Sequence, residues 1–319
     1  MNKKPWFQRL HLRPIFPLLM LAGLFIFIVY NHIATEDKLR AKVVMEPDCE
    51  DLLMNRLKIQ DDGLDGYYIR AVKRGCNIFS NPQKHASRYV RANIRCKDCH
   101  LELGMRAETA PIGQAWVQSD KYDPVTGIIL SYELRTMQCF INSSNGFKPN
   151  ILDSVIQDLK IYGRYLAFKQ GLREGVEYPE RRFTKVPPTG EGDDYLRGKV
   201  LFEKKCAMCH GKQGLGSTAK DGSVIIPSLA GPGAWNTDSR MYNEAITLAA
   251  IIKTTMPAHE RGTLTDTQAR DIAAYLVTMP RPAGNNKGVI AAARQQLIMR
   301  TMPPLFSLIE KWKAKDEAQ

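Results

Sequence analysis

Two five-residue stretches decide the fold of this chain: Cys96-Lys97-Asp98-Cys99-His100 and Cys206-Ala207-Met208-Cys209-His210. Each has the pattern C-x-x-C-H, which is typical of c-type haem attachment. The two thiols bond to the vinyl groups of one haem, and the adjacent histidine supplies an axial nitrogen to its iron. The alternatives are a thioredoxin-like redox motif or half of a zinc site. Because the motif occurs twice and lacks companion ligands at zinc-finger spacing, the sequence predicts two covalently bound haem c groups.

Helices are expected on both sides of the second motif. One is predicted over 195–205, and Thr265 with Gln268 forms a capping box for another that runs to about residue 278. A loop rich in Gly and Pro lies between them. This order resembles a class I cytochrome c, and the first half repeats it more loosely up to a helix predicted over 151–168. We therefore expect a mainly α fold with two class I cytochrome c-like haem domains.

The segments are expected in this order: 1–13 a basic cytoplasmic segment, 14–30 a transmembrane anchor, 31–60 a stalk, 61–172 the first haem domain, 173–192 a linker, 193–282 the second haem domain and 283–319 a C-terminal tail. The linker is assigned from its Pro, Gly and charged residues.

The anchor is assigned from an uncharged apolar run at 14–30, which follows a basic and acid-free segment at 1–13. A run of this length is at the lower limit for spanning a bilayer. Because no cleavage site of the A-x-A kind follows it, an uncleaved anchor is preferred, and a secretory signal peptide is the alternative. With the basic side inside, we expect a single pass through a bacterial inner membrane and haem domains in the periplasm.

The composition is that of an ordinary globular protein with a basic surface. The 319 residues are 44% hydrophobic and 24% charged, with a net charge of +12. Such a charge favours an anionic partner, which includes a membrane surface or a small anionic substrate. No nucleic-acid recognition motif is found in the sequence, so no nucleic-acid partner is expected.

Three of the seven cysteines lie outside the two motifs. Cys49 and Cys76 precede the first motif and are candidates for a disulfide in an oxidising compartment, with two buried free thiols as the alternative. Cys139 is then the odd cysteine of an exported protein, which marks it for attention.

The second axial ligands decide what each haem does. For the second haem the expected ligand is Met256, which is followed by Pro257, as is usual in class I cytochromes c; Lys253 and His259 are competitors. His/Met ligation gives a relatively high potential that suits electron transfer.

For the first haem, position alone leaves two candidates, Met137 and Cys139. Met137 would make this haem another electron carrier. Cys139 as a thiolate would stabilise ferric iron, lower the potential and place a nucleophile beside a redox centre.

The chain resembles the dihaem thiosulfate dehydrogenases, which also act as tetrathionate reductases, over roughly residues 61–282. The matching features are Ala110-Pro111, Arg135-x-x-x-Cys139-Phe140-x-x-Ser143-x-Asn145-Gly146, Leu166-Ala167-x-x-x-Gly171, Arg197-Gly198, Gly211 after the second motif, Pro227-Ser228-Leu229, Trp235-Asn236 and Met256-Pro257. The segment around Cys139 is the most specific, because other dihaem cytochromes need no cysteine there.

The resemblance implies an enzyme that couples two thiosulfate ions to tetrathionate, or the reverse, and exchanges electrons with a soluble or membrane cytochrome. It implies that Cys139 is the axial ligand of the catalytic haem and that Arg135 and Ser143 line the substrate pocket. Gln114 and Arg106 are further candidates for that pocket. Some members carry a lysine before the distal Met as an exchangeable ligand; here that neighbour is Thr255, which departs from the pattern.

A second function class stays open, a membrane-anchored dihaem electron carrier without a substrate of its own. Cys139 separates the two, because only the enzyme requires a sulfur ligand of this kind on the first haem.

Overall fold

A computed structural model describes residues 20–31, 47–123, 128–179, 182–188, 192–243 and 245–284. The chain divides into two compact units, Met1–Val44 and Met45–Gln319. Residues 20–31 of the first unit are helical and exposed. Within the described ranges no helix has the length and apolar character that a membrane crossing requires. The anchor predicted for 14–30 thus gains no support, and its residues 14–19 lie outside the described residues, as does most of the predicted tail.

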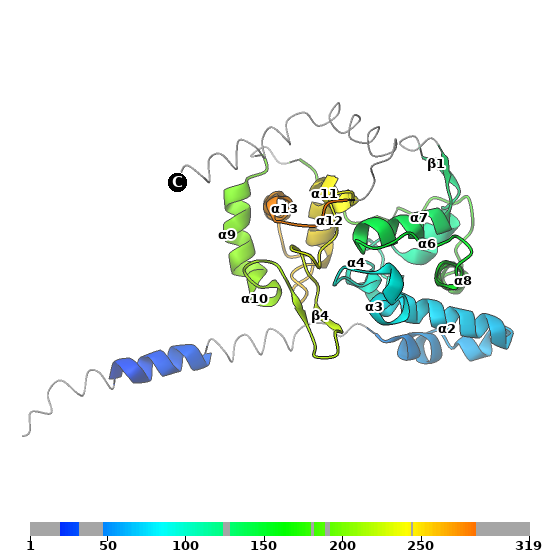
Figure 1. The fold of residues 1–319 in the computed structure, drawn as a ribbon, viewed down its shortest axis with the longest axis horizontal. Helices are drawn as coiled ribbons and strands as arrows, with labels where there is room; N and C mark the ends of the chain where they lie inside the picture. The colour runs from blue at the N-terminus through cyan, green and yellow to red at the C-terminus, as the bar shows by residue number, and fades with distance from the viewer. Residues whose placement is uncertain are drawn as a thin grey trace, which may run out of the picture. The chain divides into compact units, whose positions relative to one another are not determined.

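The second unit is mainly helical, as predicted (Figure 1). Its first half contains η1 (Asp51–Arg56), η2 (Ile59–Asp61), α2 (Gly66–Ser80), α3 (Pro82–His85), η3 (Ser87–Tyr89), α4 (Cys96–Cys99), α5 (Leu101–Gly104), α6 (Ile112–Val117), β1 (Lys121–Asp123), β2 (Ile128–Leu130), α7 (Tyr132–Gln138), η4 (Cys139–Ser143) and α8 (Ser154–Lys169). Its second half contains α9 (Tyr195–Lys205), α10 (Ala207–His210), β3 (Ser217–Thr218), β4 (Val224–Ile226), α11 (Arg240–Asn243), α12 (Ala245–Thr255) and α13 (Asp266–Thr278). The two strand pairs, β1 with β2 and β3 with β4, are antiparallel.

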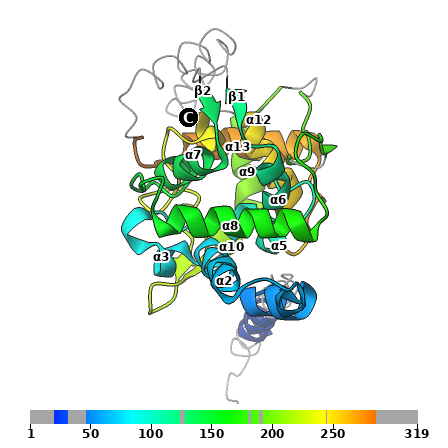
Figure 2. The ribbon, with the colours of Figure 1, turned by 90° about the vertical axis from the view of Figure 1, so that its right-hand side faces the viewer.

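In the first half, α2 packs closely across α8 (Figure 2). A Cβ on Gly75 would lie 2.2 Å from the carbonyl oxygen of Asp158, so only glycine allows this approach. The Asp158 carboxylate is buried and accepts hydrogen bonds at 2.7 and 2.8 Å from the guanidinium of Arg74. Beside this crossing, the rings of Phe79 and Tyr162 are in contact, with centroids 5.7 Å apart.

The second half builds the same crossing from α9 and α13. A Cβ on Gly198 would lie 1.9 Å from the carbonyl oxygen of Asp271. The buried Asp271 carboxylate accepts hydrogen bonds from Arg197 at 2.8 and 3.0 Å. The rings of Phe202 and Tyr275 have centroids 5.4 Å apart. Both halves therefore share R-G-x-x-x-F on the leading helix and D-x-x-x-Y on the closing helix, an internal repeat of the helix crossing.

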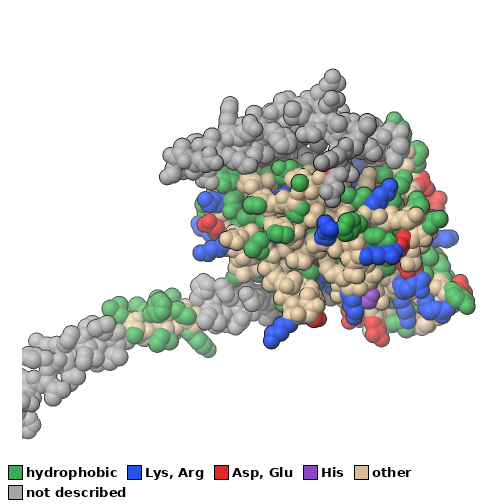
Figure 3. Space-filling view, in the orientation of Figure 1, with side chains coloured by type: hydrophobic (Ala, Val, Ile, Leu, Met, Phe, Trp, Pro, Cys, Tyr) green, Lys and Arg blue, Asp and Glu red, His purple; other side chains and the backbone are tan. Residues whose placement is uncertain are grey.

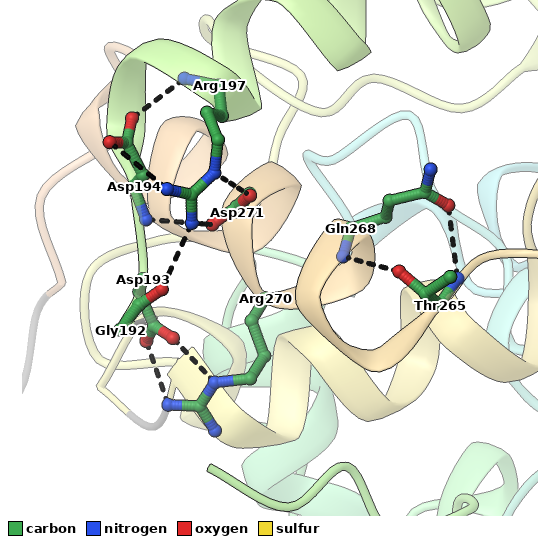
Figure 4. A network of polar contacts seen from close by, with 8 residues as sticks. All are labelled: Gly192, Asp193, Asp194, Arg197, Thr265, Gln268, Arg270 and Asp271. Atoms are coloured by element: carbon green, nitrogen blue, oxygen red, sulfur yellow. Dashed lines mark hydrogen bonds and ion pairs between the residues drawn. The ribbon is translucent and has the colours of Figure 1, made fainter. Parts of the chain in front are cut away.

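Polar contacts fix the start of α9 and of α13 (Figure 4). The backbone N–H of Asp194 donates to Asp271 at 2.8 Å, and Arg270 pairs with Asp193. Thr265 accepts from the N–H of Gln268 at 3.1 Å, and the Gln268 side chain accepts from the N–H of Thr265 at 3.0 Å. The predicted capping box is therefore confirmed, and it supplies partners for N–H groups that a helix end leaves without them.

The predicted linker 173–192 packs against both halves where the structure describes it. Val186 is 1% exposed and belongs to the hydrophobic core of the second half, against which Phe183 also packs. Thr184 donates from its backbone to Thr254 at 3.3 Å and from its hydroxyl to Glu108 at 3.3 Å. This segment therefore helps to join the halves, although its composition is that of a loop.

The surface is of mixed character. On the face shown in Figure 3, Lys and Arg side chains lie among acidic, hydrophobic and other groups and do not form one continuous basic stripe.

Candidate functional site

The two motif histidines are held in the same way. Nδ1 of His100 lies 2.7 Å from the carbonyl oxygen of Ala110, and Nδ1 of His210 lies 2.9 Å from that of Pro227. A carbonyl oxygen only accepts, so Nδ1 carries the proton in both rings and Nε2 is left to bind a metal. Burial lowers the pKa of both histidines, which favours the neutral ring that iron requires.

The four motif cysteines lie on single helical turns with their thiols outside any disulfide. Before the first turn, the N–H of Arg95 donates to Asp98 at 2.7 Å, and the Arg95 guanidinium binds the same carboxylate. The Arg95 side chain also donates to the carbonyl oxygen of Val224 at 2.9 Å. Asp98 thus caps the motif, and Arg95 ties it to the second half.

Cys49 and Cys76 form a disulfide with Cα atoms 5.8 Å apart, which settles the alternative left open by the sequence. The bond joins the segment before η1 to the buried face of α2. Cys139 is left as the free cysteine outside the motifs.

Buried donors in the second half test whether a haem fits. The indole Nε1 of Trp235 and the Nε and Nη1 atoms of Arg281 are buried and have no hydrogen-bond partner. The guanidinium of Arg281 lies 4.7 Å from the Trp235 ring centroid, and burial lowers the pKa of Arg281 to about 10. A buried cation without an anion is costly. Haem propionates are carboxylates, so the second half fits a haem, and these two residues would hold one of its propionates.

Met256 lies in the half that carries the second motif. It is half-buried and packs against the same core as Cys206. Its competitor Lys253 forms an ion pair with Asp266 at 2.9 Å, so that ammonium group is engaged elsewhere. Thr255, the neighbour that replaces a lysine, is 1% exposed, and its hydroxyl donates to the backbone of its own helix.

Cys139 and Met137 lie in different surroundings. Met137 is 5% exposed and belongs to the hydrophobic core of the first half. Cys139 is half-buried at the start of η4, a π-helix of the kind often found at functional sites. Met137 and Phe140, on either side of Cys139, belong to the core against which Cys96 of the first motif packs. Burial raises the pKa of the Cys96 thiol, and an electrostatic interaction with Cys139 adds to the effect. Cys139 and the first motif therefore lie in the same part of the first half.

The predicted pocket residues lie on the same segment. Arg135 is near His100, whose pKa falls mainly through burial and partly through the charge of Arg135. Its guanidinium also donates to Gln138 at 3.0 Å. Ser143 is the last residue of η4 and is half-buried. Arg135 and Ser143 thus lie four residues before and four residues after Cys139 on the α7–η4 segment.

The two weaker candidates differ. Gln114 has a buried side-chain oxygen without a hydrogen-bond partner, which suits a polar pocket. Arg106 makes an exposed ion pair with Glu102 at 3.8 Å. A surface pair of this kind contributes little to stability and leaves Arg106 available to solvent.

The two motifs lie close together. The charge of Asp98, inside the first motif, contributes to the pKa of His210 in the second. The N–H of Asn93 donates to Gly233 at 2.7 Å, and the N–H of Ser228 donates to Asn93 at 3.2 Å. The loop that holds His210 is therefore bonded to the segment that leads into the first motif.

Two C-x-x-C-H turns with oriented histidines, inside crossed helices, define a c-type cytochrome. Residues 193–276 match the family model described as cytochrome c oxidase, cbb3-type, subunit III. The chain is 35% identical over 215 residues to a thiosulfate dehydrogenase of Stutzerimonas stutzeri (67% of this chain, 69% of the relative). It is 33% identical over 234 residues to one of Psychrobacter arcticus (72% and 70%).

Among solved structures, the thiosulfate dehydrogenase TsdBA of Marichromatium purpuratum matches with a TM-score of 0.67 and 29% identity, covering 73% of this chain and 51% of that one. The chain thus spans about half the length of that protein. On the sequence relatives and this fold, the chain belongs to the thiosulfate dehydrogenase family.

Proposed function

We propose that the chain is a dihaem c-type oxidoreductase that couples two thiosulfate ions to tetrathionate and passes the electrons to an acceptor cytochrome. The observation that carries the proposal is the free Cys139 beside the first haem motif. Family membership supports the substrate, since the related proteins are named thiosulfate dehydrogenases.

The substrate charge explains the residues around Cys139. Coupling joins the terminal sulfurs of two dianions through one new S–S bond and releases two electrons, with no proton gained or lost. The dianions repel each other, so the site must hold them with cations and hydrogen-bond donors. Arg135 would donate two parallel N–H groups to sulfonate-like oxygens, and the Ser143 hydroxyl would add another donor.

Two haems match the two electrons, because each bound haem accepts one. His100 and Cys139 would hold the first iron, and His210 and Met256 the second. A thiolate ligand lowers the potential and a methionine raises it, so electrons would run from the first haem to the second. Tetrathionate reduction is the same step in reverse.

Location and partner follow from the chemistry of attachment. Haem is joined to C-x-x-C-H motifs on the outer side of the bacterial inner membrane, which supports a periplasmic location for the haem domains. An anchor at 14–30 would keep the enzyme at that membrane, near a soluble or membrane cytochrome that takes the electrons.

The test is anaerobic turnover of the holoprotein with thiosulfate and a ferric acceptor, alongside tetrathionate with a reduced donor. Cys139→Ala should retain covalent haem and lose turnover by orders of magnitude. Met137→Leu is the matched control, because a volume-conserving change in the core should leave the rate near that of the wild type. Normal turnover by Cys139→Ala, or a spectrum with methionine on both haems, would establish the alternative of a simple electron carrier.

A further inference from the structure

Asn236 joins the second half to the segment that carries Cys139. It is 0% exposed. Its backbone N–H donates to the carbonyl oxygen of Asn142 at 3.1 Å, and its side-chain Nδ2 donates to the carbonyl oxygen of Ile141 at 2.9 Å. Nδ2 also lies 3.3 Å from Oδ1 of Asn145. All three acceptors lie in η4 or directly after it.

The other side of Asn236 is fixed within its own half. Its Oδ1 accepts from the N–H of Asp238 at 3.1 Å, and its carbonyl oxygen accepts from the N–H of Ser239 at 3.1 Å. The N–H groups of Asn236 therefore donate to the first half, and its oxygen atoms accept from the second half. Asn236 therefore fixes η4 of the first half relative to the segment 236–239 of the second half.

The hydrogen bonds donated by Asn236 reach carbonyl groups at the end of η4. The last carbonyl groups of a helix have no donor from the helix itself. The N–H of Ser144 closes η4 onto the carbonyl oxygen of Cys139 at 2.9 Å, while the carbonyl groups of Ile141 and Asn142 receive Asn236. Asn236 thus caps, from the opposite half, the turn whose first residue is Cys139.

We propose that Asn236 is a positioning residue that holds η4 in the conformation that directs the Cys139 sulfur to the first iron. The inference rests on the proposed role of Cys139 as a ligand. Loss of the Nδ2 donor leaves a buried carbonyl group unpaired, and η4 then relaxes toward other donors. The Cys139 sulfur would then be less firmly directed to the first iron, whereas His100, held by Ala110, would keep its place.

Three variants of the holoprotein test the proposal. Asn236→Ala removes the whole amide, and Asn236→Asp keeps the acceptor toward Asp238 but removes the donor. Asn145→Gly is the mild variant: φ at Asn145 is 45°, a conformation glycine adopts freely, so the Oδ1 acceptor is removed without strain in the backbone. Asn150→Ala is the control, since Asn150 is exposed and lies after η4.

The measurement is the electron paramagnetic resonance spectrum of the ferric protein, with covalent haem content alongside. We expect partial loss of the thiolate-ligated low-spin signal in both Asn236 variants, a smaller loss in Asn145→Gly and none in Asn150→Ala. The signal of the second haem should stay unchanged, and thiosulfate turnover should fall about tenfold in Asn236→Asp.

A first-haem signal like that of the wild type in the Asn236 variants, or in Asn145→Gly if those two fail to fold, overturns the proposal. Cys139→Ala keeps this outcome separate from the proposed function. If Cys139→Ala also leaves the first-haem signal unchanged, the assignment of Cys139 as ligand is wrong. If only Cys139→Ala alters it, the positioning role alone is wrong.

Discussion

The guanidinium of Arg281 lies over the indole of Trp235 at 4.7 Å, and both side chains keep buried N–H groups that no protein acceptor meets. If a propionate of the second haem fills this place, Arg281 is its counter-cation. A cation near the haem stabilises the reduced state, which carries less positive charge.

We predict that Arg281→Gln lowers the potential of the second haem by tens of millivolts and leaves that of the first unchanged. Spectroelectrochemical titration of the holoprotein measures both. Arg173→Gln is the control, because Arg173 is exposed. An equal potential of the second haem in Arg281→Gln and in the wild type would show that Arg281 is not the counter-cation of a haem propionate.

Met256→His should also lower the potential of the second haem, because a second imidazole replaces a thioether ligand. Lys253→Met should leave it unchanged, since Lys253 already pairs with Asp266. A change in the absorption spectrum of the second haem in Lys253→Met would contradict the assignment of Met256.

Gly198→Ala and Gly75→Ala should each destabilise the fold. The added methyl group would meet a backbone oxygen at 1.9 Å and 2.2 Å respectively, and the crossed helices must move apart. Overpacking of this kind costs about 1–3 kcal/mol. Thermal unfolding of the holoprotein measures the loss. Gly66→Ala, whose nearest contact is the flexible end of Arg70 at 3.3 Å, should unfold near the wild-type temperature.

Asp62 should make stability depend on acid pH. Its carboxylate accepts from Lys169 at 2.7 Å and from Tyr165 at 2.9 Å, and the hydrogen bond from Lys169 is the main cause of its lowered pKa. Because the pKa is lower in the folded state, this stabilisation is present above the unfolded value, about 4, and is lost as the pH falls through the folded value.

Asp62→Asn should therefore lower the unfolding temperature at neutral pH and have less effect near pH 3, where the carboxylate of the unfolded chain is already protonated. Unfolding curves of both proteins at the two pH values measure the difference. A deficit of the same size at both values would mean that the charge of Asp62 is not the cause.

Local signals in the sequence predicted the helices beside the second motif. The capping box at Thr265 and the helix over 195–205 depend on neighbouring residues, and the structure has both. The helix predicted over 151–168 begins later, at Ser154, because Asp153 accepts from the N–H of Val155 and caps it there.

Contacts between residues far apart in the chain could not be predicted from the sequence. Asn236 meets a carbonyl group 95 residues away, and nothing local marks such a pair. The sequence predicted a looser repeat in the first half but not the shared R-G-x-x-x-F and D-x-x-x-Y pattern. The reason is that α3 and η3 intervene between Phe79 and the first motif, whereas only residues 203–205 separate Phe202 from the second. The burial of Val186 depends on the second core, which composition alone does not reveal.

The repeated crossing of α2 with α8 and α9 with α13 gives the molecule two equivalent scaffolds whose ligand loops are free to differ. Each scaffold carries its own Arg–Asp pair and its own glycine contact, so a change in one ligand loop leaves the other frame intact. Under the proposed function, the first copy would carry the reactive sulfur of Cys139, and the second would serve as an electron carrier.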